Sequence, residues 1–233
     1  MKKRILCVIP ARKGSKGLKN KNFLFFDKKR LIHYPILKST KIDHVSKTVF
    51  SSDSKKYINF VKKKFKQVDT LLRDKKLAND ESKTFDVVLE ALKHYEENNV
   101  FFDIILLLEP TSPLTSIEMI NKGINLLLRN FNKFDAVIPV VNLPKFNSAF
   151  SINIKKNMFN GKKFPNNLRR QKFNTYFLSG NFYISKVTSY IKNKGFYSKK
   201  TYAVTVDQKF YSDIDDIYDF KEAEFKKNFF NLK

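Results

Sequence analysis

The sequence predicts an α/β fold in which a mostly parallel sheet is covered by helices. Short β-branched runs alternate with longer segments of helical spacing over residues 4–140, and several of the runs are followed by Pro10, Ser52-Asp53 or Pro110. Strand–helix alternation is typical of βαβ units, whose strands run parallel. The length of 233 residues fits one domain, because domains typically hold ~100–200 residues.

The strands and helices follow one another along the first 140 residues. Runs with strand length cover Arg4–Ile9, Thr48–Ser51, Val68–Leu72, Ile104–Leu108 and Ala136–Val140. Segments with helical spacing cover Leu31–Ser39, Lys55–Phe65, Thr84–Tyr95 and Ile117–Leu128. Within residues 84–95, one helix face carries Phe85, Val88, Leu89 and Leu92.

The alternation breaks after Val141. Residues 142–175 hold Pro144, Gly161, Pro165 and a basic cluster, and they predict an inserted hairpin or arm rather than core structure. A further strand over Phe182–Ser185 and a closing helix over Asp216–Phe225 complete the chain. We therefore expect a single domain over residues 1–233, with 142–175 as an insertion.

Composition narrows the function classes. Lys+Arg is 46 and Asp+Glu is 22, a net charge of +24 that suggests a polyanionic partner. The lysines are spread along the whole chain, however, and this favours a solvated lysine surface, so we expect no nucleic-acid partner. One cysteine excludes disulfides. The longest apolar run has strand length and no secretory leader is recognisable, so we expect a cytoplasmic protein without a membrane segment.

The loop after the first strand has the composition of a phosphate site. It reads Ala11-Arg12-Lys13-Gly14-Ser15-Lys16-Gly17-Leu18-Lys19-Asn20-Lys21-Asn22. Glycines let backbone N–H groups approach an anion, and an arginine can bind two phosphate oxygens at once. The loop matches neither a Walker A motif nor a dinucleotide fingerprint. Taken alone, it also fits a basic surface loop with turn glycines.

The second candidate segment is acidic. Asp213 and Asp215 are two residues apart, so an extended backbone would turn both carboxylates to one side. Two such carboxylates near a triphosphate are suited to Mg²⁺. The same residues also fit the acidic N-terminus of the last helix, with Asp215 or Asp216 as its cap. Both interpretations can hold at once.

Together these segments resemble the acylneuraminate cytidylyltransferase family, the CMP-sialic acid synthetases. Its opening motif, I-P-A-R-x-G-S-K-G followed by K-N, matches Ile9–Gly17 and Lys21-Asn22. Further matches occur in the same order at Ser51–Asp53, Arg73, Leu77–Asp80, Glu109–Leu114, Ser179–Ile184 and Asp213–Asp219. The resemblance implies a three-layer Rossmann-like fold of the nucleotide-diphospho-sugar transferase type, with residues 142–175 as a dimerisation arm.

The resemblance implies transfer of CMP from CTP to the 2-hydroxyl of a sialic-acid-like nonulosonic acid, with Mg²⁺ as cofactor and a homodimer as assembly. It implies catalytic roles for Arg12, Lys21 and Asp213, and Mg²⁺ ligands at Asp213 and Asp215. It places the nucleotide on Ala11, Arg12, Gly14, Ser15, Lys16, Gly17, Lys21, Asn22, Arg73 and Ser82. It places the sugar on Glu109, Thr111, Ser112, Arg169, Arg170, Ser179 and Gly180.

The sugar half departs from the family motifs. Glu109 and Ser179 replace a glutamine and an asparagine, and Thr115 replaces an arginine. A carboxylate at Glu109 would favour a sugar with a cationic substituent, unless it faces water or pairs with a lysine. The alternatives are therefore a transferase of the same fold for another sugar acid or nucleotide, a degenerate relative, and a basic nucleic-acid-binding protein.

Overall fold

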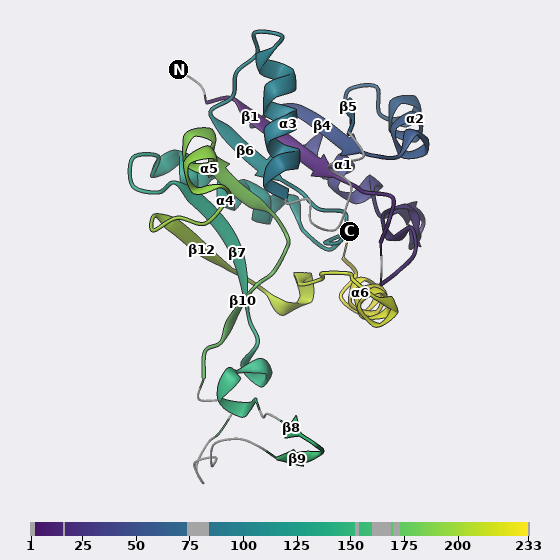
Figure 1. Cartoon of the computed structure of the whole chain (residues 1–233), viewed down its shortest axis with the longest axis vertical. Helices are drawn as coiled ribbons and strands as arrows, with labels where there is room; N and C mark the ends of the chain where they lie inside the picture. Colours follow the sequence, from purple (N-terminus) through teal and green to yellow (C-terminus); the bar gives the residue numbers. More distant parts are fainter. Residues whose placement is uncertain are drawn as a thin grey trace.

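The computed structural model describes residues 3–15, 17–73, 84–151, 154–159, 169 and 173–232. One eight-stranded sheet forms the centre of the molecule (Figure 1). Its strands are β1 (Ile5–Pro10), β4 (Val45–Ser52), β5 (Asp69–Leu72), β6 (Ile104–Leu107), β7 (Ala136–Asn142), β10 (Tyr176–Leu178), β11 (Tyr183–Lys186) and β12 (Thr201–Val206). The helices are α1 (His33–Ser39), α2 (Lys55–Lys64), α3 (Thr84–Glu96), α4 (Ile117–Arg129), α5 (Val187–Asn193) and α6 (Ile217–Phe229).

The sheet is mixed but mostly parallel, as predicted. Its order is β10-β7-β11-β6-β1-β4-β5, with β12 beside β7. The pairs β1–β4, β1–β6, β4–β5 and β7–β12 are parallel, whereas β11 runs antiparallel between β6 and β7 and β10 runs antiparallel to β7. The fold class of the sequence analysis is confirmed.

The two faces of the sheet are covered by different helices, because β1 alternates between two cores. Ile5, Cys7 and Ile9 belong to one core, into which α1, α2 and α4 pack. Leu6 and Val8 belong to the other, which α3 and α5 cover. A strand buried on both faces explains the unbroken apolar run that the sequence shows there.

Helix α6 stands apart from these layers. It packs on a small hairpin of β2 (Phe25–Phe26) and β3 (Lys29–Arg30), and both contribute to a third cluster around the buried Phe26, Ile214 and Phe220. The sequence analysis missed this hairpin, and also α5, β10 and β12. The expected closing helix is present, and it extends to Phe229.

The described residues between β7 and β10 leave the body of the molecule. Figure 1 shows them projecting away from the sheet, with β10 as part of the return. They hold the short helical turns η3 (Pro144–Phe146) and η4 (Ser148–Phe150), and the hairpin of β8 (Ile154–Lys155) and β9 (Met158–Phe159). We call the described residues of this stretch, 143–151, 154–159, 169 and 173–175, the projection.

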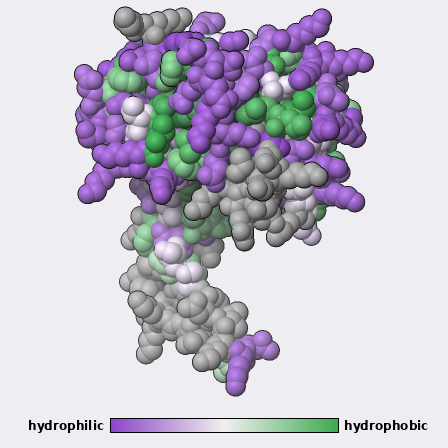
Figure 2. Space-filling model, turned by 45° about the horizontal axis from the view of Figure 1, so that its top comes forward, coloured by the Kyte–Doolittle hydropathy of each residue, from purple (hydrophilic) through white to green (hydrophobic). Residues whose placement is uncertain are grey.

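Hydrophilic residues cover much of the body surface seen in Figure 2, in keeping with the net charge of +24. Of the residues that the structure describes, none lies in a helix long and apolar enough to cross a membrane.

Candidate active site

Candidate residues gather where the parallel strands end. The loop after β1, Asp53 after β4, Arg73 after β5 and Glu109 after β6 all follow the carboxyl ends of neighbouring strands. Ligands of open α/β sheets bind outside this edge. The loop that follows β1 and helix α6 lie beyond this edge of the sheet (Figure 1).

The loop after β1 is held to strand β4 by its backbone. The buried Ala11 donates its N–H to the Ser51 carbonyl over 2.9 Å, and the N–H of Lys13 bonds to Oδ1 of Asp53 over 2.8 Å. The Asn22 side-chain amide donates to the Arg12 carbonyl over 3.0 Å and so closes the loop across its base. Gly14 and Ser15 lie within the described loop, whereas Lys16 lies outside the described residues.

Gly17 allows this loop to touch the acidic segment. A Cβ atom on Gly17 would lie within 2.4 Å of the Asp215 carbonyl oxygen, a distance that real Cβ atoms do not show. A Cβ on Gly14 would meet nothing within 4 Å. The two segments that the sequence analysis singled out are therefore in direct backbone contact at Gly17.

Lys21 joins the same two segments through its charge. It lies in the short helical turn η1 (Lys21–Phe23), and its Nζ is 2.7 Å from Oδ1 of Asp215. The Lys21 side chain is 10% exposed and that of Asp215 is 80% exposed, so the ammonium group is enclosed while the carboxylate stays accessible.

The acidic segment also caps α6. Asp216 accepts hydrogen bonds from the backbone N–H groups of Tyr218 and Asp219. The Asp219 carboxylate in turn accepts the backbone N–H of Asp216, which completes a capping box. The buried Ile214 separates two exposed residues, Asp213 and Asp215. Capping by Asp216 thus leaves Asp213 and Asp215 available, and both interpretations of this segment coexist.

Negative charge accumulates beside Lys21. Desolvation and the neighbouring Asp215 raise the pKa of Asp213 above its usual range. Burial, followed by Asp213, raises the pKa of the half-buried Glu109 to about 7, although Lys21 acts in the opposite direction. No cluster of three or more His, Cys, Asp or Glu side chains that could hold a metal occurs within the described ranges.

Arg73 lies on the other side of the loop. It is 6% exposed, its backbone N–H donates to the Ser52 carbonyl, and its Nη2 donates to the Ser51 carbonyl over 3.1 Å. Burial lowers the pKa of Arg73, Asp53 and Glu90 oppose this shift, and the charge of Arg12 adds to it. Arg12 and Arg73 follow the carboxyl ends of β1 and β5. Ser82, also predicted for the nucleotide, falls in residues 74–83, which are not described.

A buried hydrogen-bond network connects the residues predicted for the sugar. Ser112 Oγ lies 3.0 Å from the Gly180 carbonyl oxygen and 2.8 Å from that of Ser212, the residue before Asp213. The Asn181 amide donates to Thr115 Oγ1 over 2.9 Å and to the Phe210 carbonyl. Three loops are thereby linked beside Asp213.

The backbone conformation and the tight packing of these loops suit the residues found there. Gly180 adopts φ of +70°, a conformation that favours glycine, and a Cβ there would lie 3.2 Å from Ser112 Oγ. The Thr111 carbonyl accepts from the N–H of Ile214 over 3.0 Å, and Ser179 is fully buried. Two departures from the family motifs have buried side chains here, at Thr115 and Ser179.

Arg169 is exposed on the projection, and Arg170 lies outside the described residues. Among described residues, no hydrogen bond or ion pair joins Arg169 to the loop after β1 or to Asp213. Sequence reasoning missed Asn181 as a site residue and also missed Lys38, a buried lysine on α1 whose Nζ donates to the Pro113 carbonyl over 2.5 Å. Asn181 lies within the motif match Ser179–Ile184, whereas Lys38 has no motif; the partners of both are more than sixty positions away in the sequence.

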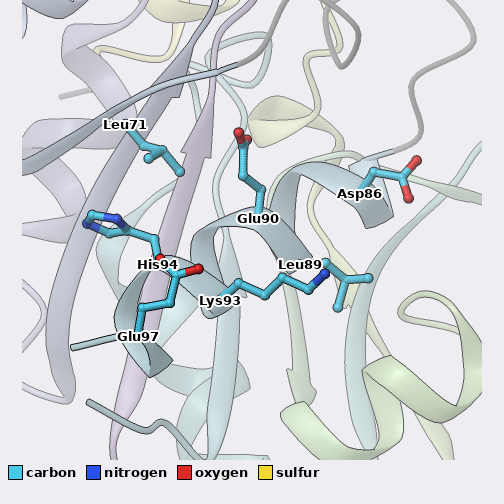
Figure 3. Close-up of a pocket in the computed structure, with 7 residues that line it drawn as sticks. All are labelled: Leu71, Asp86, Leu89, Glu90, Lys93, His94 and Glu97. Atoms are coloured by element: carbon cyan, nitrogen blue, oxygen red, sulfur yellow. The ribbon is translucent and has the colours of Figure 1, made fainter. Parts of the chain in front are cut away.

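A cavity of about 460 Å³ lies beside α3 (Figure 3). It is lined by Leu71, Asp86, Leu89, Glu90, Lys93, His94 and Glu97. None of the predicted site residues lines it.

A family model described as Cytidylyltransferase matches residues 6–231. The similar curated proteins include an N-acylneuraminate cytidylyltransferase of Escherichia coli, 33% identical over 60% of this chain and 32% of that protein. A CMP-N,N'-diacetyllegionaminic acid synthase of Legionella pneumophila is 37% identical over 53% of each chain. A pseudaminic acid cytidylyltransferase of Campylobacter jejuni is 32% identical over 55% of each. The matches thus span a third to about half of these relatives.

Solved structures with the same fold include a CMP:2-keto-3-deoxy-manno-octonic acid synthetase complexed with CTP. Its TM-score is 0.66 at 14% identity, and 95% of this chain and 97% of that chain are covered. A 4-diphosphocytidyl-2C-methyl-D-erythritol synthase from Anaerococcus prevotii gives a TM-score of 0.63 at 15% identity, with 95% and 97% covered. At these identities the likeness concerns the fold.

Proposed function

This chain belongs to the cytidylyltransferase family, and on that premise we propose that it transfers CMP from CTP to the 2-hydroxyl of a sialic-acid-like nonulosonic acid. The sugar oxygen forms a bond to the α-phosphorus, the bond to the β-phosphate oxygen breaks, and pyrophosphate leaves while the hydroxyl proton is released. The names of the curated relatives support this substrate class. The observation that carries the proposal is the 2.7 Å approach of Lys21 to Asp215, which brings phosphate-binding and metal-binding chemistry together.

The nucleotide half of the site would bind CTP through fixed cations. Arg12 and Lys21 hold the triphosphate, and Lys21 compensates the charge that develops on the α-phosphate during attack. The loop over Gly14, Ser15, Lys16 and Gly17 adds backbone N–H groups. Asn22, Arg73 and Ser82 would bind on the nucleoside side. The enclosed position of Lys21 supports its role, because a fixed ammonium group needs little reorganisation.

Asp213 and Asp215 would hold Mg²⁺. The raised pKa of Asp213 reflects unfavourable negative charge that a divalent cation would relieve. Mg²⁺ is usually bound by one or two carboxylates together with substrate phosphates, which suits two carboxylates without a larger cluster. When bound, the ion would polarise the phosphoryl group toward attack.

The sugar would lie against the network formed by Thr111, Ser112, Ser179 and Gly180, with Glu109 beside it. This network ends at Ser212, so the same loops that face the sugar also set the position of Asp213. Arg169 and Arg170 would reach the sugar carboxylate from the projection of a second protomer.

The homodimer rests on the apolar surface of the projection and of the edge strand β10. Large hydrophobic side chains are exposed there at Phe146, Met158, Tyr176, Phe177 and Leu178. Side chains of this size on an edge strand favour a protein partner. In sedimentation, the native chain should be a dimer and the double variant Tyr176→Ser/Leu178→Ser a monomer. The variant should also lose turnover if Arg169 acts across the interface.

The deciding experiment measures pyrophosphate release from CTP with Mg²⁺ over a panel of sialic, legionaminic and pseudaminic acids and their amino- and amidino-substituted forms, with Kdo as the outsider. We expect release with one nonulosonic acid, none with ATP, GTP or UTP, and none from Asp213→Ala. If CTP binds but no pyrophosphate is released with any sugar of the panel, the remaining interpretation is a transferase for another sugar acid. Absence of CTP binding would refute the proposal, and steeply salt-dependent binding of polynucleotides would then favour a nucleic-acid-binding protein.

A further inference from the structure

A second concave site, which we call the basic–aromatic groove, lies between the β2–β3 hairpin and helices α1 and α2. Its volume is about 450 Å³, within the range of ~300–1,000 Å³ typical of small-molecule sites. Rings line it at Phe25, Phe60 and Phe65. Phe25 is 59% exposed, and the Arg30 guanidinium lies 4.3 Å from its ring centroid, so a ligand would stack on the ring face opposite Arg30.

The groove is strongly cationic. Lys28, Lys29, Arg30 and Lys64 line it together with His33 and Leu37, and none of its lining residues is acidic. The acid of the hairpin turn, Asp27, lies 3.9 Å from Lys227 of α6. Burial lowers the pKa of His33, a hydrogen bond to the Arg30 backbone opposes this, and the charges of Lys64, Arg30 and Lys29 lower it further. This fits a positive potential in the groove.

Arg30 is fixed in position without a carboxylate partner in the described part of the chain. Its guanidinium lies 4.0 Å from the ring centroid of Phe23 and 4.3 Å from that of Phe25, and Nη1 donates to the Phe23 carbonyl over 2.6 Å. A guanidinium held in this way loses little freedom when it binds an anion, and it retains further N–H donors.

We propose that the basic–aromatic groove binds a nucleoside phosphate. The base would stack on Phe25 and Phe60, and the phosphate would pair with Arg30 and the lysines. Bases stack favourably on aromatic rings, and lysine and arginine are the usual donors to phosphate oxygens. The small volume and the lack of acidic groups favour this ligand over an acidic peptide.

The groove is joined to the proposed CTP site through Phe23. Phe23 ends the turn η1, which also carries Lys21 and Asn22, and its ring stacks on Tyr57 with centroids 4.7 Å apart. The Asn22 carbonyl accepts the N–H of Ile32, which is next to the groove residue His33 in the sequence. A ligand that holds Arg30 against Phe23 would therefore order η1, and CTP would bind more tightly to it.

The binding test uses AMP and inorganic phosphate as probes, in equilibrium dialysis of the whole chain without divalent metal. It does not depend on transferase activity. We expect close to one AMP per chain in the groove. The double variant Lys28→Ala/Lys64→Ala should weaken AMP binding by about tenfold, as the loss of two charge contacts predicts. The matched variant Lys122→Ala/Lys192→Ala removes two exposed lysines from α4 and α5 and should bind AMP as the native chain does.

Phe25→Ala separates stacking from charge, because it should weaken AMP while leaving inorganic phosphate unchanged. If Lys28→Ala/Lys64→Ala and Lys122→Ala/Lys192→Ala weaken AMP binding equally, the effect comes from the overall charge of the protein, and the proposal is overturned. Much tighter binding of a polynucleotide than of AMP, lost in the groove variant, would also overturn it. Saturating AMP should tighten CTP binding about fivefold in the native chain but not in the groove variant. Unchanged CTP affinity would refute the coupling.

Discussion

The Nζ of Lys21 and the Oδ1 of Asp215 lie 2.7 Å apart, and this pair links the loop after β1 to the segment before α6. Lys21 is enclosed, so its charge needs a partner at all times. When CTP and Mg²⁺ bind as proposed, the phosphates replace Asp215 as the partner of Lys21. The ion pair therefore holds the site together before the substrate arrives.

Lys21→Met should lower the rate of pyrophosphate release by about a hundredfold, because it removes a fixed charge from the α-phosphate. Lys19→Met is the matched control, since Lys19 is an exposed lysine of the same loop. Steady-state kinetics with varied CTP would measure both. Similar losses in the two variants would mean that Lys21 contributes only to general charge.

The two roles of the acidic segment can be separated by substitution. Asp213→Asn should abolish turnover without loss of stability, because the raised pKa of Asp213 means that its negative charge is unfavourable in the folded chain at neutral pH. Asp216→Ala should cost about 1 kcal/mol of unfolding free energy through loss of the α6 cap, while turnover is retained. Urea unfolding and pyrophosphate release would test the pair. Loss of stability in Asp213→Asn with loss of turnover in Asp216→Ala would contradict these two roles.

Gly17 and Gly14 form a second matched pair. Gly17→Ala places a methyl group against the Asp215 carbonyl, so the loop must move away from the acidic segment, at a cost of about 1–3 kcal/mol. We expect a higher KM for CTP and a lower melting temperature. Gly14→Ala should leave the melting temperature unchanged, since its Cβ would meet no neighbouring atom. Equal behaviour of the two variants would show that the contact at Gly17 is unimportant.

The fold could be predicted from the sequence where the spacing of apolar residues has the period of a helix or a buried strand. Strand β1 and helix α4 are buried on regular faces, and their apolar spacing is visible in the chain. Strands β10 and β12 were missed because they lie at the margin of the sheet: every residue of β10 is exposed, and β12 buries only Val204 and Val206. Exposure removes the alternation on which strand prediction depends.

Candidate site residues can be predicted where they belong to a recognisable motif. Lys21 and Asp213 belong to such motifs, and the structure brings their segments together. The contacts of Lys38 with Pro113 and of Asn181 with Thr115 were not predictable, because tertiary packing alone selects these partners. A single sequence carries no record of such pairs.

Lys38 predicts a pH dependence of stability. Burial lowers its pKa to about 7, with a further contribution from Lys227. The unfolded chain binds a proton at this lysine up to pH ~10.4, whereas the folded chain releases it above about pH 7. Stability from this group therefore rises as pH rises from about 7 to ~10.4, by at most ~1.4 kcal/mol per pH unit.

Lys38→Met removes this titration. The difference in unfolding free energy between the native chain and Lys38→Met should therefore shift in favour of the native chain between pH 7 and pH ~9.5. Urea titrations at the two pH values would measure it, and groups shared by both proteins cancel in the difference. A difference that does not change with pH would mean that Lys38 stays protonated in the fold.

Glu109 predicts how the sugar is selected. It is half-buried after β6; its carbonyl accepts the N–H of Ser112, whereas its carboxylate forms no hydrogen bond or ion pair with the described part of the chain. A carboxylate here repels an acidic sugar, because two unit charges ~4 Å apart interact by ~4 kcal/mol at an effective dielectric constant of ~20. A cationic amino or amidino substituent would turn part of that repulsion into attraction.

Glu109→Gln keeps the shape of the side chain and removes its charge. We expect kcat/KM for a neutral nonulosonic acid to rise, and the preference for an amino-substituted sugar over the neutral one to fall by about tenfold, a change of ~1.4 kcal/mol. Competition between the two sugars in one reaction measures this ratio directly. Asp86→Asn, a change of equal charge on α3 outside the site, is the control and should leave the ratio unchanged. If the ratio is also unchanged in Glu109→Gln, the carboxylate faces solvent and another residue selects the sugar.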